Sequence, residues 1–290
     1  MIIVSFTLKI VKKNIVLYHY FVFKKNENFI MPHIKIFVKQ QALLIVLLFF
    51  ASFTFAQKKD TTKYGISFKS GVALTNNGFS FIPSFSLGKP AAIVNLAIGG
   101  KKLSFEPEFR FSLEGKPWSF IFIWRYKILN TQQFQLTAGV HLPALNYKTV
   151  SVIKNGILQN VIQTQRFVSF EATPNFNITK NISIGMLYLY GYGVESDAIK
   201  NTHLITLRSS FSNIKLLKYY AVKFNPQIFY LNMDKVDGYY ASWGCTVSKQ
   251  NFPLSISTMM YKPIATNITG KNFDWNISLI YSFNKNFISK

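Results

Sequence analysis

Residues 102–127 read KLSFEPEFRFSLEGKPWSFIFIWRYK, and their pattern decides the fold of this chain. In the first half, Phe105 and Phe109 alternate with charged side chains, and the second half repeats the alternation with an aromatic face from Trp118 to Tyr126. A period of two residues is that of a β-strand with two different faces. Similar stretches continue to the C-terminus. This pattern predicts an all-β protein, a transmembrane antiparallel up-and-down β-barrel, because a closed barrel pairs every backbone polar group that lipid would leave unpaired.

The amino-acid composition agrees with a membrane barrel. Of the 290 residues, 49% are hydrophobic, 17% are aromatic and only 15% are charged. Phenylalanine and tyrosine are abundant, with 29 and 15 copies, and they suit strands and membrane interfaces. An ordinary soluble domain has about 25% charged residues, so the low charged fraction favours a protein whose surface faces lipid.

The N-terminal part has the features of an export signal. Met31 is followed by two lysines, an apolar run over residues 42–50 and small residues that end at Ala56. The apolar core has about 14 residues, fewer than the about 20 of a spanning helix, so a signal peptide over residues 31–56 is favoured over a single membrane anchor. Residues 1–30 are interpreted as an upstream extension from a misassigned start codon. Export to the outer membrane is the expectation.

The charge of the exported part is strongly positive. Seven of the 33 basic and one of the 11 acidic side chains fall within residues 1–56, which leaves a net charge near +16 on residues 57–290. Nucleic acid is not an expected partner, because an exported barrel does not meet it in the cytoplasm. A basic lumen, or a basic rim facing lipid and anionic lipopolysaccharide, is expected instead. The single Cys245 has no partner for an internal disulfide.

Alternation along the chain predicts about twelve membrane-spanning strands, between ten and fourteen. A bacterial barrel has an even number of strands and both ends on the periplasmic side, so an additional strand over residues 64–73 is disfavoured. Residues 57–77 are therefore predicted to lie in the periplasm or the lumen, residues 78–284 to form the barrel, and residues 285–290 to form a tail. The predicted strands span residues 78–88, 90–99, 102–113, 117–127, 133–143, 165–177, 181–192, 201–211, 217–231, 237–248, 252–262 and 273–283.

The largest predicted loop covers residues 144–164. An Asn-Gly pair at its centre is the preferred pair of a type I′ turn, so this loop is predicted to be a β-hairpin that stands out from the membrane. Pairing about the turn conflicts by one residue with lumenal positions for both His141 and Glu171. A β-bulge near Pro143 would remove the conflict.

Charged side chains at lumenal positions form the main candidate site. Pairing across the 114–117 turn places Glu106 opposite Arg125. The favoured interpretation is a ladder of salt bridges that fills and stiffens a narrow barrel, since charges in a low-dielectric wall need partners. The alternative is catalysis by a carboxylate acting as a general acid or base. The predicted ladder consists of Glu106, Glu108, Arg110, Glu114, Arg125, Lys127 and Glu171.

All four arginines lie in predicted strands, and arginine suits paired, hydrogen-bonded sites better than lysine does. Arg166 does not fit the lumenal alternation and is placed at the outer rim, where it would contact a lipid phosphate. The other three are Arg110, Arg125 and Arg208.

The histidines argue against an enzyme. Barrel lipases and lipid A deacylases place a serine two residues after a histidine, and neither His141 nor His203 has one. Barrel proteases pair histidine with a neighbouring aspartate, which is also missing from the sequence around both. His141 is predicted to be a lumenal hydrogen-bonding residue. No metal site and no cofactor are predicted.

The stretches FIPSFSLGKPAA and LSFEPEFRFSLEGKPWSF, the Ala56/Gln57 cleavage site and the final LIYSF together carry a family resemblance. The chain resembles uncharacterised outer-membrane β-barrel proteins of Gram-negative bacteria, particularly those of the Bacteroidetes. The resemblance implies that the barrel-assembly machinery recognises the last strand, at Leu279, Tyr281 and Phe283. It implies no agreed activity.

The function expected from the sequence is a narrow channel or passive transporter for small solutes, with a preference for anions. Twelve strands lie between the filled barrel of about eight and the open porin of about 16, so a narrow or plugged lumen is expected. The alternative is a structural or binding barrel whose 144–164 hairpin contacts lipopolysaccharide or a partner. A lipid-modifying enzyme is a remote third.

Overall fold

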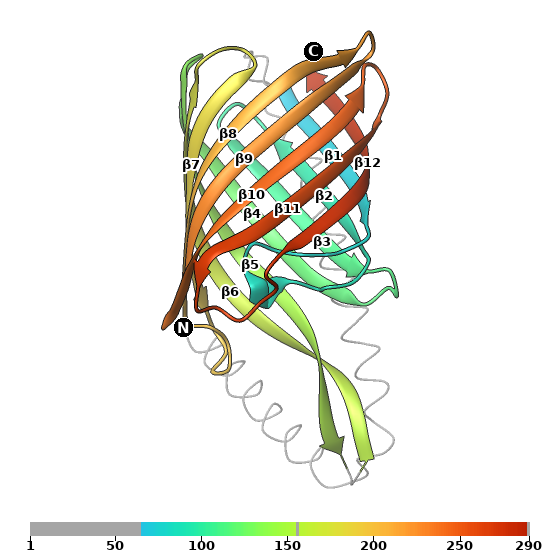
Figure 1. Ribbon diagram of the computed structural model, residues 1–290, viewed down its shortest axis with the longest axis vertical. Coiled ribbons are helices and arrows are strands. Elements are labelled where there is room, and N and C mark those ends of the chain that lie inside the picture. The colour runs from blue at the N-terminus through green and yellow to red at the C-terminus, as the bar shows by residue number, and fades with distance from the viewer. Residues whose placement is uncertain (1–64, 155–156, 289–290) are drawn as a thin grey trace, which may run out of the picture. The chain divides into compact units, whose positions relative to one another are not determined.

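A computed structural model of the protein describes residues 65–154 and 157–288, and the predicted extension and signal peptide lie outside these ranges. Twelve antiparallel strands close into one barrel (Figure 1), which confirms the predicted fold and strand number. No helix within the described ranges is long and apolar enough to cross a membrane. The strands are β1 (Gly65–Thr75), β2 (Ala91–Gly99), β3 (Leu103–Ser112), β4 (Pro117–Asn130), β5 (Phe134–Lys154), β6 (Ile157–Asn177), β7 (Ile182–Gly193), β8 (Asn201–Leu217), β9 (Tyr220–Met233), β10 (Val236–Lys249), β11 (Leu254–Thr266) and β12 (Asp274–Ile288).

The first strand differs from the prediction. Residues 65–75 form β1, which pairs with both β12 and β2 and so closes the barrel. Residues 78–88, predicted as the first strand, form no strand at all. Pro83 has no N–H to donate to a ladder, and Gly88 has a φ of 73°, which a strand does not use. One segment therefore replaces the other, and the strand number stays even.

The predicted tail is also wrong in part. Strand β12 continues to Ile288, and Lys285 lies opposite Phe68 of β1. The final residues therefore lengthen the seam between the first and last strands instead of leaving the wall.

The barrel has two different rims. The terminal rim contains the start of β1, the end of β12 and five short connections, whereas the loop rim contains the three longest connections and the β5–β6 hairpin that extends beyond the wall (Figure 1). The connections at the terminal rim are residues 100–102, 131–133, 178–181, 218–219 and 250–253. Those at the loop rim within the described ranges are residues 76–90, 113–116, 194–200, 234–235 and 267–273.

The outer wall is apolar. On β12, Trp275, Ile277 and Leu279 point outward and remain 46–48% exposed, while Asn276 and Ser278 between them are less exposed. Exposed apolar rings and branched chains recur on the outer positions of other strands, for example Phe170 on β6. Water would solvate such a surface poorly, and lipid is the solvent that it suits.

Strands β5 and β6 extend past the other strands as one hairpin, paired as far as Lys154 and Ile157. The register of this pair shifts by one residue between His141 and Ala144. The predicted bulge beside Pro143 is therefore confirmed, and it allows both His141 and Glu171 to face the lumen.

Residues 76–90, which we call the plug segment, link β1 to β2 and cover the lumen at the loop rim. A short 3₁₀ turn, η1 (Pro83–Phe85), lies within this segment. Its three phenylalanines contact aromatic rings on three distant strands, with centroids 4.7–5.6 Å apart. The pairs are Phe79 with Tyr261 of β11, Phe81 with Phe229 of β9, and Phe85 with Phe167 of β6.

Trp118 packs into this cover. The alternation predicts that it faces lipid with the other aromatic residues of β4, and that prediction is wrong. It is 2% exposed, and its indole N–H donates a hydrogen bond to the Phe85 carbonyl at 2.7 Å. A register shift between Arg110 and Phe111 of the β3–β4 pair lies beside it. Gly78 makes room for the ring, because a Cβ there would approach the indole to 2.9 Å.

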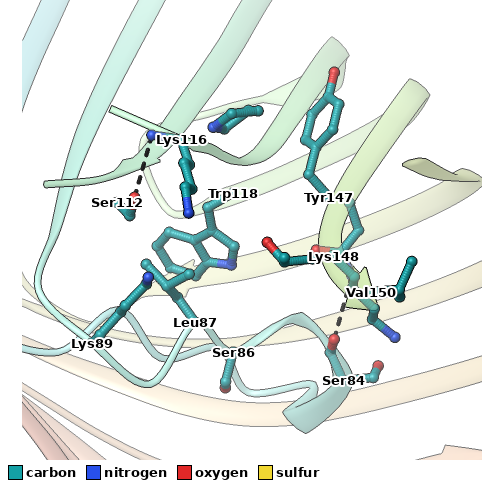
Figure 2. Close-up of a pocket in the computed structure, with 13 residues that line it drawn as sticks. Ser84, Ser86, Leu87, Lys89, Ser112, Lys116, Trp118, Tyr147, Lys148 and Val150 are labelled. Atoms are coloured by element: carbon teal, nitrogen blue, oxygen red, sulfur yellow. Dashed lines mark hydrogen bonds between the residues drawn. The ribbon is translucent and has the colours of Figure 1, made fainter. Parts of the chain in front are cut away.

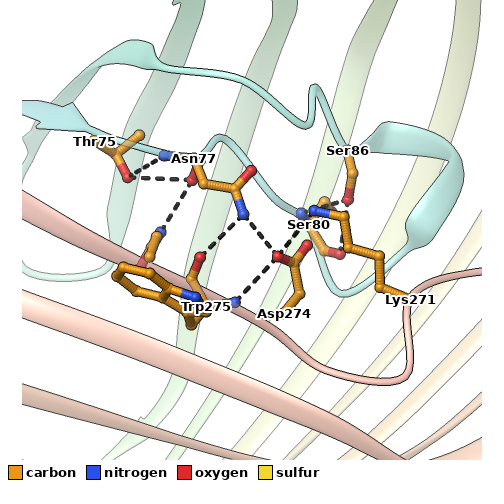
Figure 3. A network of polar contacts seen from close by, with 8 residues as sticks. Thr75, Asn77, Ser80, Ser86, Lys271, Asp274 and Trp275 are labelled. Carbon is orange, nitrogen blue, oxygen red and sulfur yellow. Dashed lines mark hydrogen bonds and ion pairs between the residues drawn. The ribbon is translucent and has the colours of Figure 1, made fainter.

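A polar latch holds the start of the plug segment to the opposite side of the seam (Figure 3). The Asn77 side-chain amide donates to the Asp274 carboxylate at 2.7 Å and to the Trp275 carbonyl at 3.0 Å. Asp274 is buried and also accepts from the Lys271 ammonium at 3.2 Å. The latch ties residues that are almost 200 positions apart in sequence, so it fixes the start of the plug segment to the last strand of the closed barrel.

Candidate functional site

The candidate site is the half of the lumen between the plug segment and the terminal rim. Three cavities of about 390, 520 and 300 Å³ lie there. Hydroxyl, amide and charged side chains from β1 to β11 line them. Five cationic side chains take part, which are Lys69, Arg125, Lys127, Arg208 and Lys223, against the three carboxylates of Glu106, Glu108 and Glu171.

Arg125 is the centre of a charged network in this half. Its guanidinium donates to the carboxylates of Glu106 on β3 and of Glu171 on β6. Glu171 is buried, and its other oxygen lies 3.0 Å from Nε2 of His141. Four neighbouring strands are thus joined through two carboxylates and one guanidinium, which satisfies charges that the wall would otherwise leave unpaired.

Glycine at position 139 of β5 leaves room for the contact between Arg125 of β4 and Glu171 of β6. Gly139 lies between Arg125 and Glu171 in the strand order and pairs with both. A Cβ at this position would lie 2.9 Å from Cγ of Glu171, so a larger residue would displace the carboxylate. The pairing predicted for Glu106 is wrong by two residues, because Ser104 and not Glu106 lies opposite Arg125. The turn covers residues 113–116, one position earlier than predicted, which shifts the pairing by two residues, and the long arginine side chain spans the diagonal.

The remaining residues of the predicted ladder do not connect to this network through ion pairs within the described ranges. Glu108 accepts from Arg110 of the same strand, and the Arg110 guanidinium lies 5.0 Å from the Trp118 ring centroid, beneath the plug segment. Lys127 lines the 390 Å³ cavity near the terminal rim. It forms no ion pair with any residue in the described ranges.

Glu114 is a correction to the prediction, since it does not face the lumen. It lies in the exposed 113–116 turn at the loop rim, where the Lys89 ammonium bonds both carboxylate oxygens at 3.0 Å. The hydrogen bond from Lys89 and the charge of Lys89 lower the pKa of Glu114. Strand β3 ends at Ser112, so the alternation of lumenal and outward positions does not extend to Glu114 in the turn.

Arg166 lies at the loop rim as expected, but a carboxylate already engages it. Its Nε and its backbone N–H donate to the two Glu195 oxygens at 2.5 and 2.6 Å. Burial acts to raise the pKa of Glu195, but these hydrogen bonds from Arg166 outweigh it and lower the pKa. A contact with a lipid phosphate stays a prediction.

Arg208 differs from the expectation that the arginines occupy paired sites. Arginines were expected to be paired, yet Arg208 forms no ion pair or side-chain hydrogen bond within the described part of the chain. It projects from β8 between the 390 and 520 Å³ cavities and lines both. Its place in a predicted strand is correct, but only the positions of the described carboxylates in space show that none of them reaches it.

A further hollow of about 370 Å³ lies at the loop rim, outside the plug segment (Figure 2). Trp118 forms part of its wall beside Leu87 and Lys89, and Tyr147 and Lys148 border it from the base of the hairpin. Lys89 is already paired with Glu114, which leaves this hollow less cationic than its lysines suggest.

The proposed assembly residues lie together on one outward face. Leu279, Tyr281 and Phe283 of β12 are 44–49% exposed. Tyr281 pairs with Val72 of β1 and Leu254 of β11 in the closed barrel. Recognition by assembly machinery stays a prediction from the resemblance.

No protein-family model matches the chain, and no curated protein matches it. Among solved structures, a KdgM porin in complex with disordered oligogalacturonate has 10% sequence identity and a TM-score of 0.46, with 75% of this chain and 99% of that chain covered. A NanC porin has 9% identity and a TM-score of 0.40 over 78% of this chain and 100% of the porin. The CymD monoaromatic hydrocarbon channel has 9% identity and a TM-score of 0.39, with 78% of this chain and 89% of that channel covered.

Proposed function

We propose that this protein is an outer-membrane barrel that works as a narrow, gated channel for small anionic solutes. The apolar outer wall supports a place in a membrane. In outer-membrane barrels the short turns face the periplasm, so the terminal rim is assigned to the periplasm and the loop rim to the outside. No catalytic activity is part of the proposal.

The charge of the lumenal cavities is the observation that carries the proposal. Five cations and three carboxylates line the three cavities, and two of those carboxylates are held by Arg125. A low-dielectric wall focuses the field of the remaining cations into the lumen, which raises the local concentration of anions. Small anions would therefore enter more readily than cations of the same size.

The plug segment supplies the gate in this proposal. Its aromatic contacts cover the lumen at the outer end, and the Asn77–Asp274 latch holds one end of it. The β1–β2 wall pairing does not involve residues 76–90, so the segment can leave the lumen without opening the barrel.

Planar-bilayer recording tests the proposal. The purified protein is expected to give small, intermittent currents that reverse at an anion-selective potential in a salt gradient. A variant in which residues 78–88 are replaced by a short Gly-Ser link is expected to give larger, steady currents with the same selectivity. A folded barrel that gives no current in either form, or cation selectivity in both, contradicts the proposal.

A second candidate function is partner binding by the β5–β6 hairpin. Ile153, Ile157 and Leu158 near its tip are 63–77% exposed, beyond the wall. Apolar side chains exposed at this level suit contact with a partner or with lipopolysaccharide. Removal of residues 148–163 would abolish cell-surface or lipopolysaccharide binding under this function and would leave channel currents unchanged.

A further inference from the structure

The 520 Å³ cavity differs from its neighbours in the signs of its charges. Arg208 of β8 and Lys223 of β9 line it, and none of the described residues in its lining carries a carboxylate. The adjoining 390 Å³ cavity contains Glu106 and Glu171 next to its cations. Among the described residues, the lining of the larger cavity is therefore mostly polar, with two positive charges and no negative charge.

The guanidinium of Arg208 has unused hydrogen-bonding capacity there. Arginine stays charged at all physiological pH values and carries five N–H donors. Within residues 65–154 and 157–288, Arg110, Arg125 and Arg166 each have a carboxylate partner, whereas Arg208 has none. An unpaired charge inside a protein wall is costly, and an anion in the cavity would remove that cost.

Neutral donors and acceptors surround the two cations. Asn175, Asn225 and Gln227 contribute amides, and Gln227 lies opposite Arg208 in the β8–β9 pair. The Gln227 amide nitrogen donates to the Ser242 hydroxyl at 2.8 Å, which fixes the direction of the amide. Serine and threonine hydroxyls from β7, β8, β10 and β11 add further polar groups, and two apolar side chains, Phe81 of the plug segment and Met259 of β11, form the rest of the lining. Such a lining suits a ligand with hydroxyl groups in addition to its charge.

We infer that this cavity is an oxyanion-binding site, in which Arg208 and Lys223 hold a carboxylate or phosphate group of a small hydroxylated solute. This inference rests on the proposed function, since it names the solute class that the lumen takes. Arg208 presents a planar pair of donors to two oxygens of the group, and Lys223 adds a second charge. The amides and hydroxyls bind the uncharged part of the solute.

Titration calorimetry of the purified barrel in a neutral detergent tests the site without any transport. Gluconate, inorganic phosphate and neutral sorbitol are the probes. Gluconate or phosphate is expected to bind and sorbitol is not; gluconate alone indicates a carboxylate solute, and phosphate alone a phosphorylated one. Arg208→Gln is expected to weaken binding by at least about tenfold, as loss of a charge-assisted hydrogen bond does. Arg208→Lys is expected to weaken it less.

Lys101→Gln is the matched control, because it removes one positive charge from the exposed β2–β3 turn and is expected to leave the affinity unchanged. Asn225→Ala tests the same cavity if Arg208→Gln does not fold, and is expected to weaken binding. Equal affinity in wild type and in the Arg208 or Asn225 variant overturns the site, as does the absence of binding by both anions. Anion-selective current without binding refutes the site alone, whereas binding without current refutes the channel alone.

Discussion

The two halves of the lumen are built from the same twelve strands and have opposite interiors. Beneath the plug segment, Leu204, Phe229, Leu231 and Tyr261 point inward and are buried. Towards the terminal rim the inward positions are charged or polar and border cavities. Alternation builds the wall in both halves, but the contents of the lumen decide whether water and solutes occupy it.

The largest effect is expected from the charged network of the polar half. Glu171→Gln leaves the Arg125 guanidinium with one charged partner and removes the charge beside His141. Loss of one partner of a buried ion pair costs about 3–5 kcal/mol. Urea unfolding of the barrel in lipid vesicles measures the loss.

Glu195→Gln is the control for that prediction, since it breaks an exposed pair at the loop rim. If Glu171→Gln and Glu195→Gln cost the same free energy of unfolding, the polar half does not depend on its buried network.

The next effect is expected in the capped half. Phe229→Ala removes a buried ring that lies 4.8 Å from Tyr240 and 5.2 Å from Phe81. The expected cost is about 3 kcal/mol, the lower end for a buried phenylalanine, because the plug segment can move into the space. The same unfolding measurement applies. Phe170→Ala on the outer wall should cost clearly less, and equal costs would show that Phe229 does not pack in a covered interior.

A smaller effect is expected at the latch that joins the capped half to the seam. Asn77→Ala removes two hydrogen bonds, one to the buried Asp274 carboxylate. The expected cost is about 1–3 kcal/mol. Because the latch fixes the plug segment, the variant should also give longer channel openings in planar bilayers. Asn130→Ala at the terminal rim is the control. Unchanged opening times in both variants would show that the latch does not control the opening of the channel.

The smallest effect concerns the pH dependence at the base of the hairpin. The lowered pKa of Glu195 means that its pair with Arg166 stabilises the protein above the ordinary carboxyl pKa. This contribution is lost as the pH falls through the lowered pKa of the folded state. It should stay below about 1 kcal/mol, as for other solvent-screened pairs. The stability difference between wild type and Glu195→Gln should therefore shrink in acid, and a difference that grows in acid would contradict the assignment.

The wall was predictable from the sequence because a period of two runs through most of each strand and is interrupted only locally by bulges. The same period in residues 78–88 misled the prediction, since Phe79, Phe81 and Phe85 face other rings and not lipid. A usable signal was present in residues 229–233, where the inward positions Phe229, Leu231 and Met233 are apolar and require a cover.

The sequence predicted which residues belong to the candidate site but not how they pair. Lumenal parity identified Glu106, Arg125, Glu171 and His141, which the structure brings together. Pairing could not be derived, because a turn one residue earlier moves the register by two positions and long side chains cross strands diagonally. For the same reason the isolation of Arg208 depends on distances that no local pattern encodes.

Cysteine labelling from water tests the contrast between the two halves most directly. In a Cys245→Ser background, single cysteines replace Asn225 in the polar half, Leu231 in the capped half and Trp275 on the outer wall, and a charged maleimide is added to the barrel in vesicles. Rapid labelling at position 225 and protection at positions 231 and 275 are predicted. Rapid labelling at position 231, or at position 275, would contradict a capped lumen inside a lipid-facing wall.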